Sequence, residues 1–324
     1  KKFKEAWGVT FQSVEPFNEP SATWWNSNGY QEGCHFDPAL QAEMIRMMRE
    51  ELDKAGLEGV GVAASDESHI DPAVHTWRSF SSAVRDQVMR VNVHGYSYSG
   101  GRRDAVFSEV NLKDGKKLWQ SEFGDDDASG KGMAQNFHMD MRWLHPTAYV
   151  YWQAVDDTEG WGLVKGDLDV GSIQKLNNKY YVMAQYCRHI RPGMKIIETG
   201  NLRQTIAAYD ESSRKLVLVS LNDKPEPSTF HYDLSSFATV SGPVTRWTTT
   251  FSGSQQYVQK SGGLSMSPDR KLSFNFSGES VVTFEIDGVS GISAPPETNR
   301  PTIPLPPPKP ASPLSSTPAT TYKP

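Results

Sequence analysis

Two glutamates stand at the ends of apolar, strand-forming runs and could form a catalytic pair. Glu19 lies in the tetrapeptide FNEP at residues 17–20, and Glu122 lies in LWQSEFGD at residues 118–125. Cleavage of a glycosidic bond needs an acid that protonates the leaving oxygen and a carboxylate that opposes the developing oxocarbenium ion. Two carboxylates in different surroundings can divide these roles, because the surroundings separate their pKa values. The sequence therefore predicts a carboxylate pair suited to the hydrolysis of glycosides.

The residues around Glu19 extend this prediction. Taken singly, Glu19 could be a loop carboxylate in a surface salt bridge, and so could Glu122. Asn18 could simply form a turn, or its amide could hold the 2-hydroxyl of a sugar, a bond that strengthens as charge builds on the ring. Trp25 follows Glu19 closely and could pack in the core or reach a neighbouring sugar subsite. We expect both Asn18 and Trp25 to bind substrate.

Four further side chains follow the ends of other expected strands. His94 and Tyr96 lie in VNVHGYS, and Trp152 and Gln153 lie in YVYWQAV. His94 could be a satisfied buried histidine and Tyr96 a packing residue, but their positions favour the site, where a tyrosine hydroxyl could tune a nucleophilic carboxylate. Trp152 could belong to the core or form a stacking platform for a sugar ring. We expect all four to bind substrate.

Other acidic residues give weaker signals. Asp66 and Glu67 end an expected strand and could bind sugar hydroxyls. Asp125, Asp126 and Asp127 form a run that could suggest a cation, but three adjacent acids on a loop are more often solvated. We therefore expect no metal, and the predicted mechanism needs no cofactor.

The elements that must position these residues alternate between strand and helix up to residue 193. Alternation of this kind predicts parallel βαβ units, and polar residues at the carboxyl ends of parallel strands are typical of a (β/α)₈ barrel. The expected fold is thus α/β with the last five strands of such a barrel, and three further strands would lie upstream of residue 1. The expected strands are residues 8–17, 57–68, 88–97, 117–125 and 147–155, and the expected helices are 37–56, 71–88, 132–145 and 178–193.

A second pattern begins after Pro192-Gly193. Short alternating strands with turn residues between them predict an all-β side domain at 194–290, with a β-sandwich architecture. Residues 291–324 are rich in Pro, Ser and Thr and are expected to form a disordered tail. The expected strands are residues 203–210, 215–222, 228–234, 245–251, 271–277 and 280–287.

Composition excludes several functional classes. The net charge of -5 gives no basic surface for nucleic acid, and no apolar run is long enough to span a membrane. Cys34 and Cys187 fit no metal spacing and could form a disulfide or stay free. Asn275-Phe276-Ser277 is a sequon for N-glycosylation, a weak signal of secretion. We expect a monomer whose partner is a polysaccharide or oligosaccharide.

The motifs together resemble glycoside hydrolase family 30. EPFNEP is similar to the acid/base motif on the fourth barrel strand, and WQSEFGD to the nucleophile motif on the seventh. VNVHGYS resembles the sixth strand and YVYWQAV the eighth, with Trp152 as the floor of the sugar subsite. The segments NEPSATWW, QEGCHF and VAASDES most resemble the fungal endo-β-1,6-galactanases. The resemblance covers roughly residues 1–288 and lacks the first three strands.

The resemblance implies a secreted, extracellular fungal enzyme that hydrolyses β-1,6-galactan, such as the side chains of arabinogalactan, with retention of configuration. Glu19 would be the acid/base and Glu122 the nucleophile, with their carboxyl groups about 5–5.5 Å apart. Another specificity of the family remains open: β-1,6-glucanase, glucosylceramidase or xylanase. A different class is also open, because a chain without the first three strands could be an inactive carbohydrate-binding fragment.

Overall fold

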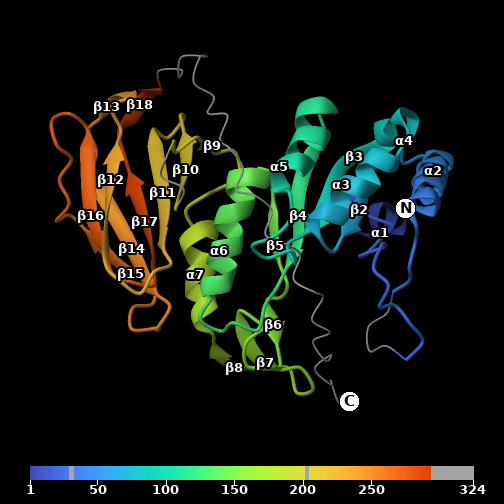
Figure 1. Ribbon diagram of the computed structural model, residues 1–324, viewed down its shortest axis with the longest axis horizontal. Helices are drawn as coiled ribbons and strands as arrows, with labels where there is room; N and C mark the ends of the chain where they lie inside the picture. The colour runs from blue at the N-terminus through green and yellow to red at the C-terminus, as the bar shows by residue number, and fades with distance from the viewer. Residues whose placement is uncertain (29–32, 201–203, 293–324) are drawn as a thin grey trace. The chain divides into compact units, whose positions relative to one another are not determined.

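The computed structural model describes residues 1–28, 33–200 and 204–292, which divide into two compact units (Figure 1). The first unit contains residues 1–123 and 139–151, and the second contains residues 124–138 and 152–292 within the described ranges. The predicted tail at 293–324 and the Gln31-Glu32 part of the QEGCHF motif lie outside the described residues. The predicted domain division at residue 193 stays a prediction.

The first unit holds a five-stranded sheet in which every strand pairs in parallel with its neighbour, in the order β1-β2-β3-β4-β5. The α/β prediction is therefore confirmed, and the strands form part of a (β/α)₈ barrel. The strands are β1 (Ser13–Val14), β2 (Gly61–Glu67), β3 (Val88–His94), β4 (Lys117–Phe123) and β5 (Tyr149–Tyr151). The helices are α1 (Lys2–Trp7), α2 (Pro38–Lys54), α3 (Ile70–Ser79), α4 (Ser82–Gln87) and α5 (Arg103–Val106), with π-helical segments η1 (Phe107–Lys113) and η2 (Asp140–Leu144).

Local sequence signals explain where the connecting helices begin. The side chain of Asp37 accepts a hydrogen bond from the backbone N–H of Leu40, and Pro38 occupies the first helical position of α2. Buried apolar residues of α2, α3 and β2 to β4 then form one core, which includes Ile45, Trp77 and Val91. This packing fixes the strands whose carboxyl ends carry the candidate site.

Two expectations for the first unit are wrong in detail, and one helical segment was missed. The strand expected at 8–17 is regular only at Ser13–Val14. The helix expected at 71–88 is two helices, because Phe80 is extended and the hydroxyl of Ser81 caps α4 by accepting from the N–H of Val84. The helical segment from α5 through η1 was not predicted.

The second unit is dominated by antiparallel sheets. A six-stranded sheet runs in the order β15-β14-β17-β11-β10-β9, beside the pairs β12-β16 and β13-β18 and a small β6-β7-β8 sheet. Its elements are α6 (Lys131–Met139), α7 (Asn178–Cys187), β6 (Val155–Asp156), β7 (Val164–Asp167), β8 (Ser172–Leu176), β9 (Lys195–Ile197), β10 (Thr205–Asp210), β11 (Lys215–Asn222), β12 (Ser228–Asp233), β13 (Phe237–Val240), β14 (Val244–Thr250), β15 (Val258–Ser261), β16 (Lys271–Phe276), β17 (Ser280–Ile286) and β18 (Val289–Ile292).

The core of this unit confirms the predicted β side domain. Leu218 and Phe284 from the six-stranded sheet pack with Tyr232 and Leu272 from the β12-β16 pair. All six predicted strands are present among the described residues. Residue 203, the first residue of the strand predicted at 203–210, lies outside the described ranges. The sequence did not predict the short strands β9, β13, β15 and β18 or the β6-β7-β8 sheet.

Candidate active site

The two candidate carboxylates lie where parallel strands end. Glu19 follows β1 in a loop, and Glu122 is the penultimate residue of β4. The register of the sheet places Glu122 opposite His94, the last residue of β3. Because the carboxyl ends of parallel strands meet at one edge, residues that are far apart in sequence converge there.

Backbone contacts hold Glu19 in place. Its side chain is buried, and its φ of 49° lies in the left-handed region that most residues avoid. The N–H of Glu19 donates to the carbonyl of Asp66 at 2.9 Å. The carbonyl of Glu19 accepts from the N–H of Ala22 at 3.0 Å and from the indole Nε1 of Trp25 at 3.1 Å. Trp25 therefore acts on the backbone of Glu19, a contact that the sequence did not predict.

His94 lies between the two glutamates. Its imidazole is fully buried, and its Nδ1 lies 3.1 Å from Oε1 of Glu19 and 3.8 Å from Oε1 of Glu122. On the other side of the ring, Nε2 lies 3.2 Å from Oδ2 of Asp66. Three carboxylates thus surround one imidazole.

This arrangement brings the two glutamates close together. One ligand atom from each of Glu19, His94 and Glu122 lies within 4.8 Å of the other two. A carboxylate oxygen of Glu19 is therefore within 4.8 Å of one of Glu122. Retaining glycosidases hold their carboxyl groups about 5–5.5 Å apart, whereas inverting enzymes separate them by about 6.5–9.5 Å. The geometry matches the closer class.

The electrostatics favour a cationic His94. Burial alone would lower its pKa, but the contacts with Asp66 and Glu19 outweigh burial and raise the pKa of His94 to about 10. Burial raises the pKa of Glu122, while His94 and a hydrogen bond from Tyr96 oppose that rise. The Tyr96 hydroxyl donates to Oε1 of Glu122 at 2.9 Å. Burial and the nearby charge of Glu122 raise the pKa of Tyr96, so this hydroxyl keeps its proton as a donor.

The structure thus brings together Glu19, Glu122, His94, Tyr96 and Trp25 among the residues proposed from the sequence. Asn18 is exposed beside Glu19, and its contact with a sugar stays a prediction.

Trp152 and Gln153 belong to the second unit. The Trp152 side chain is 47% exposed, which leaves its ring available for stacking. The Nε2 of Gln153 donates to Oδ2 of Asp156 at 2.6 Å. Their roles in substrate binding stay predictions.

The sequence analysis treated Asp66 and Glu67 alike, but the structure separates them. Asp66 faces His94, and its Oδ1 accepts from the hydroxyl of Ser121 at 2.5 Å. Glu67 is buried, and its carboxylate accepts from the side chains of Ser21 and Thr76, each at 2.7 Å, and from Gln41 at 3.2 Å. Glu67 therefore ties the loop after Glu19 to helices α2 and α3.

The acidic run at 125–127 is mainly structural. The expectation of a solvated run is wrong for Asp125, whose carboxylate is buried and accepts from Nζ of the fully buried Lys179 at 2.9 Å. Asp127 accepts from the N–H groups of Ser129 and Gly132 and so holds the turn that leads into α6. Asp126 is exposed, as predicted.

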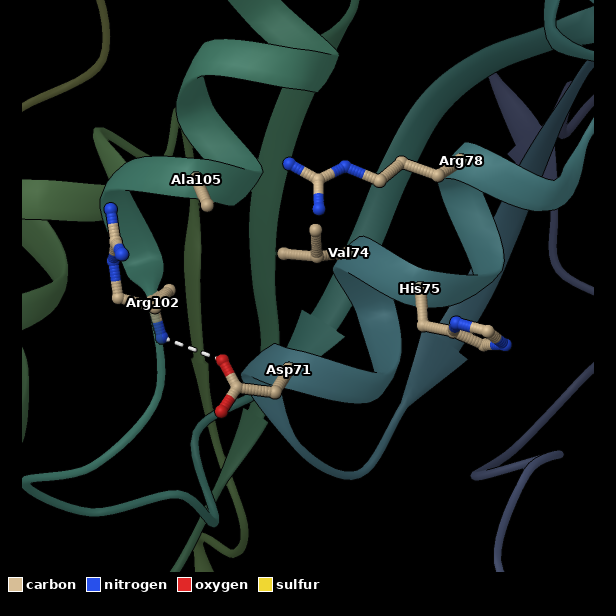
Figure 2. Close-up of a pocket in the computed structure, with 6 residues that line it drawn as sticks. All are labelled: Asp71, Val74, His75, Arg78, Arg102 and Ala105. Atoms are coloured by element: carbon tan, nitrogen blue, oxygen red, sulfur yellow. Dashed lines mark hydrogen bonds between the residues drawn. The ribbon is translucent and has the colours of Figure 1, made fainter. Parts of the chain in front are cut away.

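Two other features do not alter the assignment. Glu19, His94 and Glu122 are also close enough in space for an ion, although acidic groups commonly gather in this way without one. Separately, a cavity of about 340 Å³ lies between α3 and α5 (Figure 2). The backbone N–H of Arg102 donates to Asp71 at its rim, and the guanidinium of Arg102 pairs with Asp104. This cavity contains none of the predicted site residues.

Both cysteines, Cys34 and Cys187, are free and exposed in the structure. None of the described helices has the length and apolar character needed to cross a membrane.

Comparison with known proteins supports the predicted family resemblance. The chain is 46% identical to an endo-β-1,6-galactanase of Hypocrea rufa over 289 residues, which cover 88% of this chain and 59% of the galactanase. The structure matches a glycoside hydrolase family 30 subfamily 8 xylanase from Clostridium acetobutylicum with a TM-score of 0.68 at 18% identity, over 88% of this chain and 68% of the xylanase. The chain resembles glycoside hydrolase family 30. The predicted resemblance is therefore confirmed.

Two further findings complete the comparison. A conserved exported protein from Bacteroides fragilis matches with a TM-score of 0.68 at 18% identity, over 88% of this chain and 66% of that protein. No protein-family model matches the chain. The chain spans 59% of the length of the curated galactanase that it matches.

Proposed function

We propose that this chain carries the catalytic centre of a retaining endo-glycosidase that hydrolyses β-1,6-galactan. The observation that carries the proposal is the approach of carboxylate oxygens of Glu19 and Glu122 to within 4.8 Å. This distance suits double displacement, because it leaves too little room for a water molecule between the second carboxylate and the anomeric carbon. The identity to the Hypocrea rufa galactanase supports the choice of substrate.

The two glutamates divide the reaction. In the first step, the Glu122 carboxylate attacks the anomeric carbon while Glu19 gives its proton to the leaving glycosidic oxygen. A covalent bond forms between Glu122 and the sugar, and the bond to the leaving group breaks. In the second step, Glu19 takes a proton from water, and the water oxygen displaces Glu122 from the anomeric carbon. Two inversions give net retention of configuration.

Neighbouring groups support both steps. The hydrogen bond from Tyr96 stabilises the ionised form of Glu122, which is the nucleophilic form. His94 places a positive charge near both carboxylates, which offsets their mutual repulsion at short range. The exposed amide of Asn18 beside Glu19 is expected to supply a contact with the sugar.

The test is product analysis with the full chain on β-1,6-galactan, β-1,6-glucan and xylan. We expect galactan to be cut internally, with the β-anomer appearing first in ¹H NMR spectra recorded before mutarotation. Initial formation of the α-anomer would overturn the retaining mechanism. Cleavage of glucan or xylan in preference to galactan would reassign the specificity. Binding to galactan without any cleavage would indicate an inactive carbohydrate-binding fragment.

Secretion is part of the same proposal. The Asn275 side chain is exposed on β16, and Ser277 two residues later is exposed as well. We expect the full chain, expressed with a secretion signal in a eukaryotic host, to lose the mass of one N-glycan when Asn275→Gln is introduced. An unmodified Asn275 in the secreted wild type would count against a secretory origin.

A further inference from the structure

Asp66 connects three strand ends of the candidate site. Its carbonyl oxygen accepts from the N–H of Glu19 at 2.9 Å. Its Oδ1 accepts from the hydroxyl of Ser121, the residue before Glu122, at 2.5 Å. Its Oδ2 lies 3.2 Å from Nε2 of His94. One residue at the end of β2 therefore touches the segments that carry both glutamates and the imidazole between them.

The backbone at Asp66 is unusual in the same way as the backbone at Glu19. Asp66 has a φ of 60° and Glu19 a φ of 49°, both in the left-handed region. Such conformations persist where surrounding contacts over-determine them, and they gather at functional sites. Here the hydrogen bond between the Glu19 N–H and the Asp66 carbonyl joins the two directly. The sheet register also shifts between Ser65 and Glu67, which turns Asp66 toward the site.

The charges around His94 are arranged unevenly about its ring. Glu19 and Glu122 approach Nδ1, and Asp66 approaches Nε2. Negative charge on both sides of the ring favours the cationic imidazole, in which both nitrogens carry protons, although Nε2 and Asp66 form an ion-pair contact without hydrogen-bond geometry.

Three more titratable groups face His94 at longer range. Glu15 follows β1, His69 precedes α3, and Tyr96 follows β3. Glu15 adds negative charge when it is ionised, but burial raises its pKa well above the usual range. Burial lowers the pKa of His69, which favours its neutral form. Asp66 is the carboxylate that contacts Nε2 of His94, and unlike Glu19 and Glu122 it takes no part in the proposed chemistry.

We propose that Asp66 is a positioning residue that keeps His94 doubly protonated, directs its Nδ1–H at the catalytic pair and anchors the backbone of Glu19. This role rests on the proposed function. While Glu122 is ionised, cationic His94 stabilises it. Once Glu122 is bound to the sugar and has lost its charge, the same cation stabilises Glu19 as the carboxylate that then accepts a proton from water.

The direct test is an NMR titration of the imidazole of His94 in the full chain, assigned by comparison with His94→Gln. In the wild type we expect both ring nitrogens to carry protons at pH 8. In Asp66→Asn we expect the midpoint of the titration to fall by at least about one pH unit, a tenfold change. A neutral His94 at pH 8 in the wild type would overturn the proposal without any substitution at Asp66, so a failure of the variant to fold does not block the test.

The matched control is Glu67→Gln, which removes the adjacent carboxylate but keeps an acceptor oxygen. Glu67 hydrogen-bonds Ser21, Gln41 and Thr76 and not His94. We expect this variant to leave the His94 midpoint where it is in the wild type. An equal fall of the His94 midpoint in both variants would mean that the total negative charge at the end of β2, and not the contact with Asp66, keeps His94 protonated.

Kinetics give a second and separate readout. For Asp66→Asn we expect kcat to fall about tenfold with little change in KM, because Asp66 acts through His94 and Glu19 and not on the sugar. A raised KM at unchanged kcat would instead make Asp66 a hydroxyl-binding residue and overturn the proposal. If the wild type hydrolyses no glycan, the proposed function fails, but the NMR titration still decides the role of Asp66.

Discussion

The hydroxyl of Tyr96 donates a 2.9 Å hydrogen bond to Oε1 of Glu122. The two residues come from different strand ends, and their contact joins a neutral donor to the proposed nucleophile. Burial raises the pKa of Glu122, and the Tyr96 hydrogen bond works against that rise. The tyrosine therefore shifts Glu122 toward its ionised form, against the effect of burial.

Tyr96→Phe should raise the pKa of Glu122, because it removes a donor to the ionised form. The acidic limb of the pH profile of kcat/KM should therefore move to higher pH. A hydrogen bond to a charged group contributes about 1.5–3 kcal/mol, so activity near the acidic limb should fall roughly ten- to a hundredfold. Profiles on β-1,6-galacto-oligosaccharides check this. A uniform loss with an unmoved limb would show that Tyr96 only packs.

Substitutions at the two glutamates should differ in their dependence on the leaving group. Glu122→Gln should abolish hydrolysis of every substrate, because no covalent intermediate can form. Glu19→Gln should lower kcat/KM for galactan about 10²–10⁴-fold but should spare kcat/KM for substrates whose leaving group needs no proton, while kcat falls for both because the second step also loses its base.

Steady-state kinetics on galactan and on an aryl galactoside check this division. The control is Glu43→Gln, which changes an exposed glutamate of α2. If Glu19→Gln lowers kcat/KM equally for both substrates, Glu19 is not the acid of the first step.

The carboxylate pair could be predicted from the sequence because each glutamate ends an apolar run, where burying a charged side chain is costly. His94 and Tyr96 stood out by the same rule. Asp66 also ends an expected strand, but only sugar binding was predicted for it. Its contacts with Ser121 and His94 depend on a left-handed backbone and a register shift. Neighbouring acids in a strand point to opposite faces, but the sequence does not say which of the two faces the site.

The fold, too, could be predicted from the sequence only in part. Alternating strand and helix predicted the parallel sheet, because periodicity reports which faces are buried. It did not predict the break at Phe80, where a capping serine starts a new helix within a continuous apolar pattern. It also did not predict the edge strand β15, whose residues are all exposed and so carry no pattern of burial.

Glu67→Ala should destabilise the chain and disturb the loop after Glu19. The substitution leaves the buried donors of Ser21, Gln41 and Thr76 without their acceptor. Each unsatisfied buried group costs about 1–3 kcal/mol, so we expect a loss of roughly 3 kcal/mol or more in the free energy of unfolding. Denaturant unfolding checks this against Glu43→Ala, a matched exposed site. Equal effects of the two substitutions would contradict the role of Glu67.

His138 should make the chain sensitive to acid. Its ring lies in the second unit, packs edge-on against Tyr186, and has no hydrogen-bond partner for either nitrogen among the described residues. Burial lowers the pKa of His138 from 6.5 to about 3. The unfolded chain therefore binds a proton at pH values where the folded chain does not. Stability from this residue is present above about pH 6.5 and is lost as the pH falls toward 3.

His138→Phe should remove that loss, because phenylalanine can occupy the site and takes up no proton. We expect its thermal midpoint to exceed that of the wild type at pH 5 by more than it does at pH 8. His75→Gln is the control, since His75 is exposed on α3 and its removal should not change the difference between the two pH values. The same gain at both pH values would mean that improved packing, and not the avoided protonation, explains the effect.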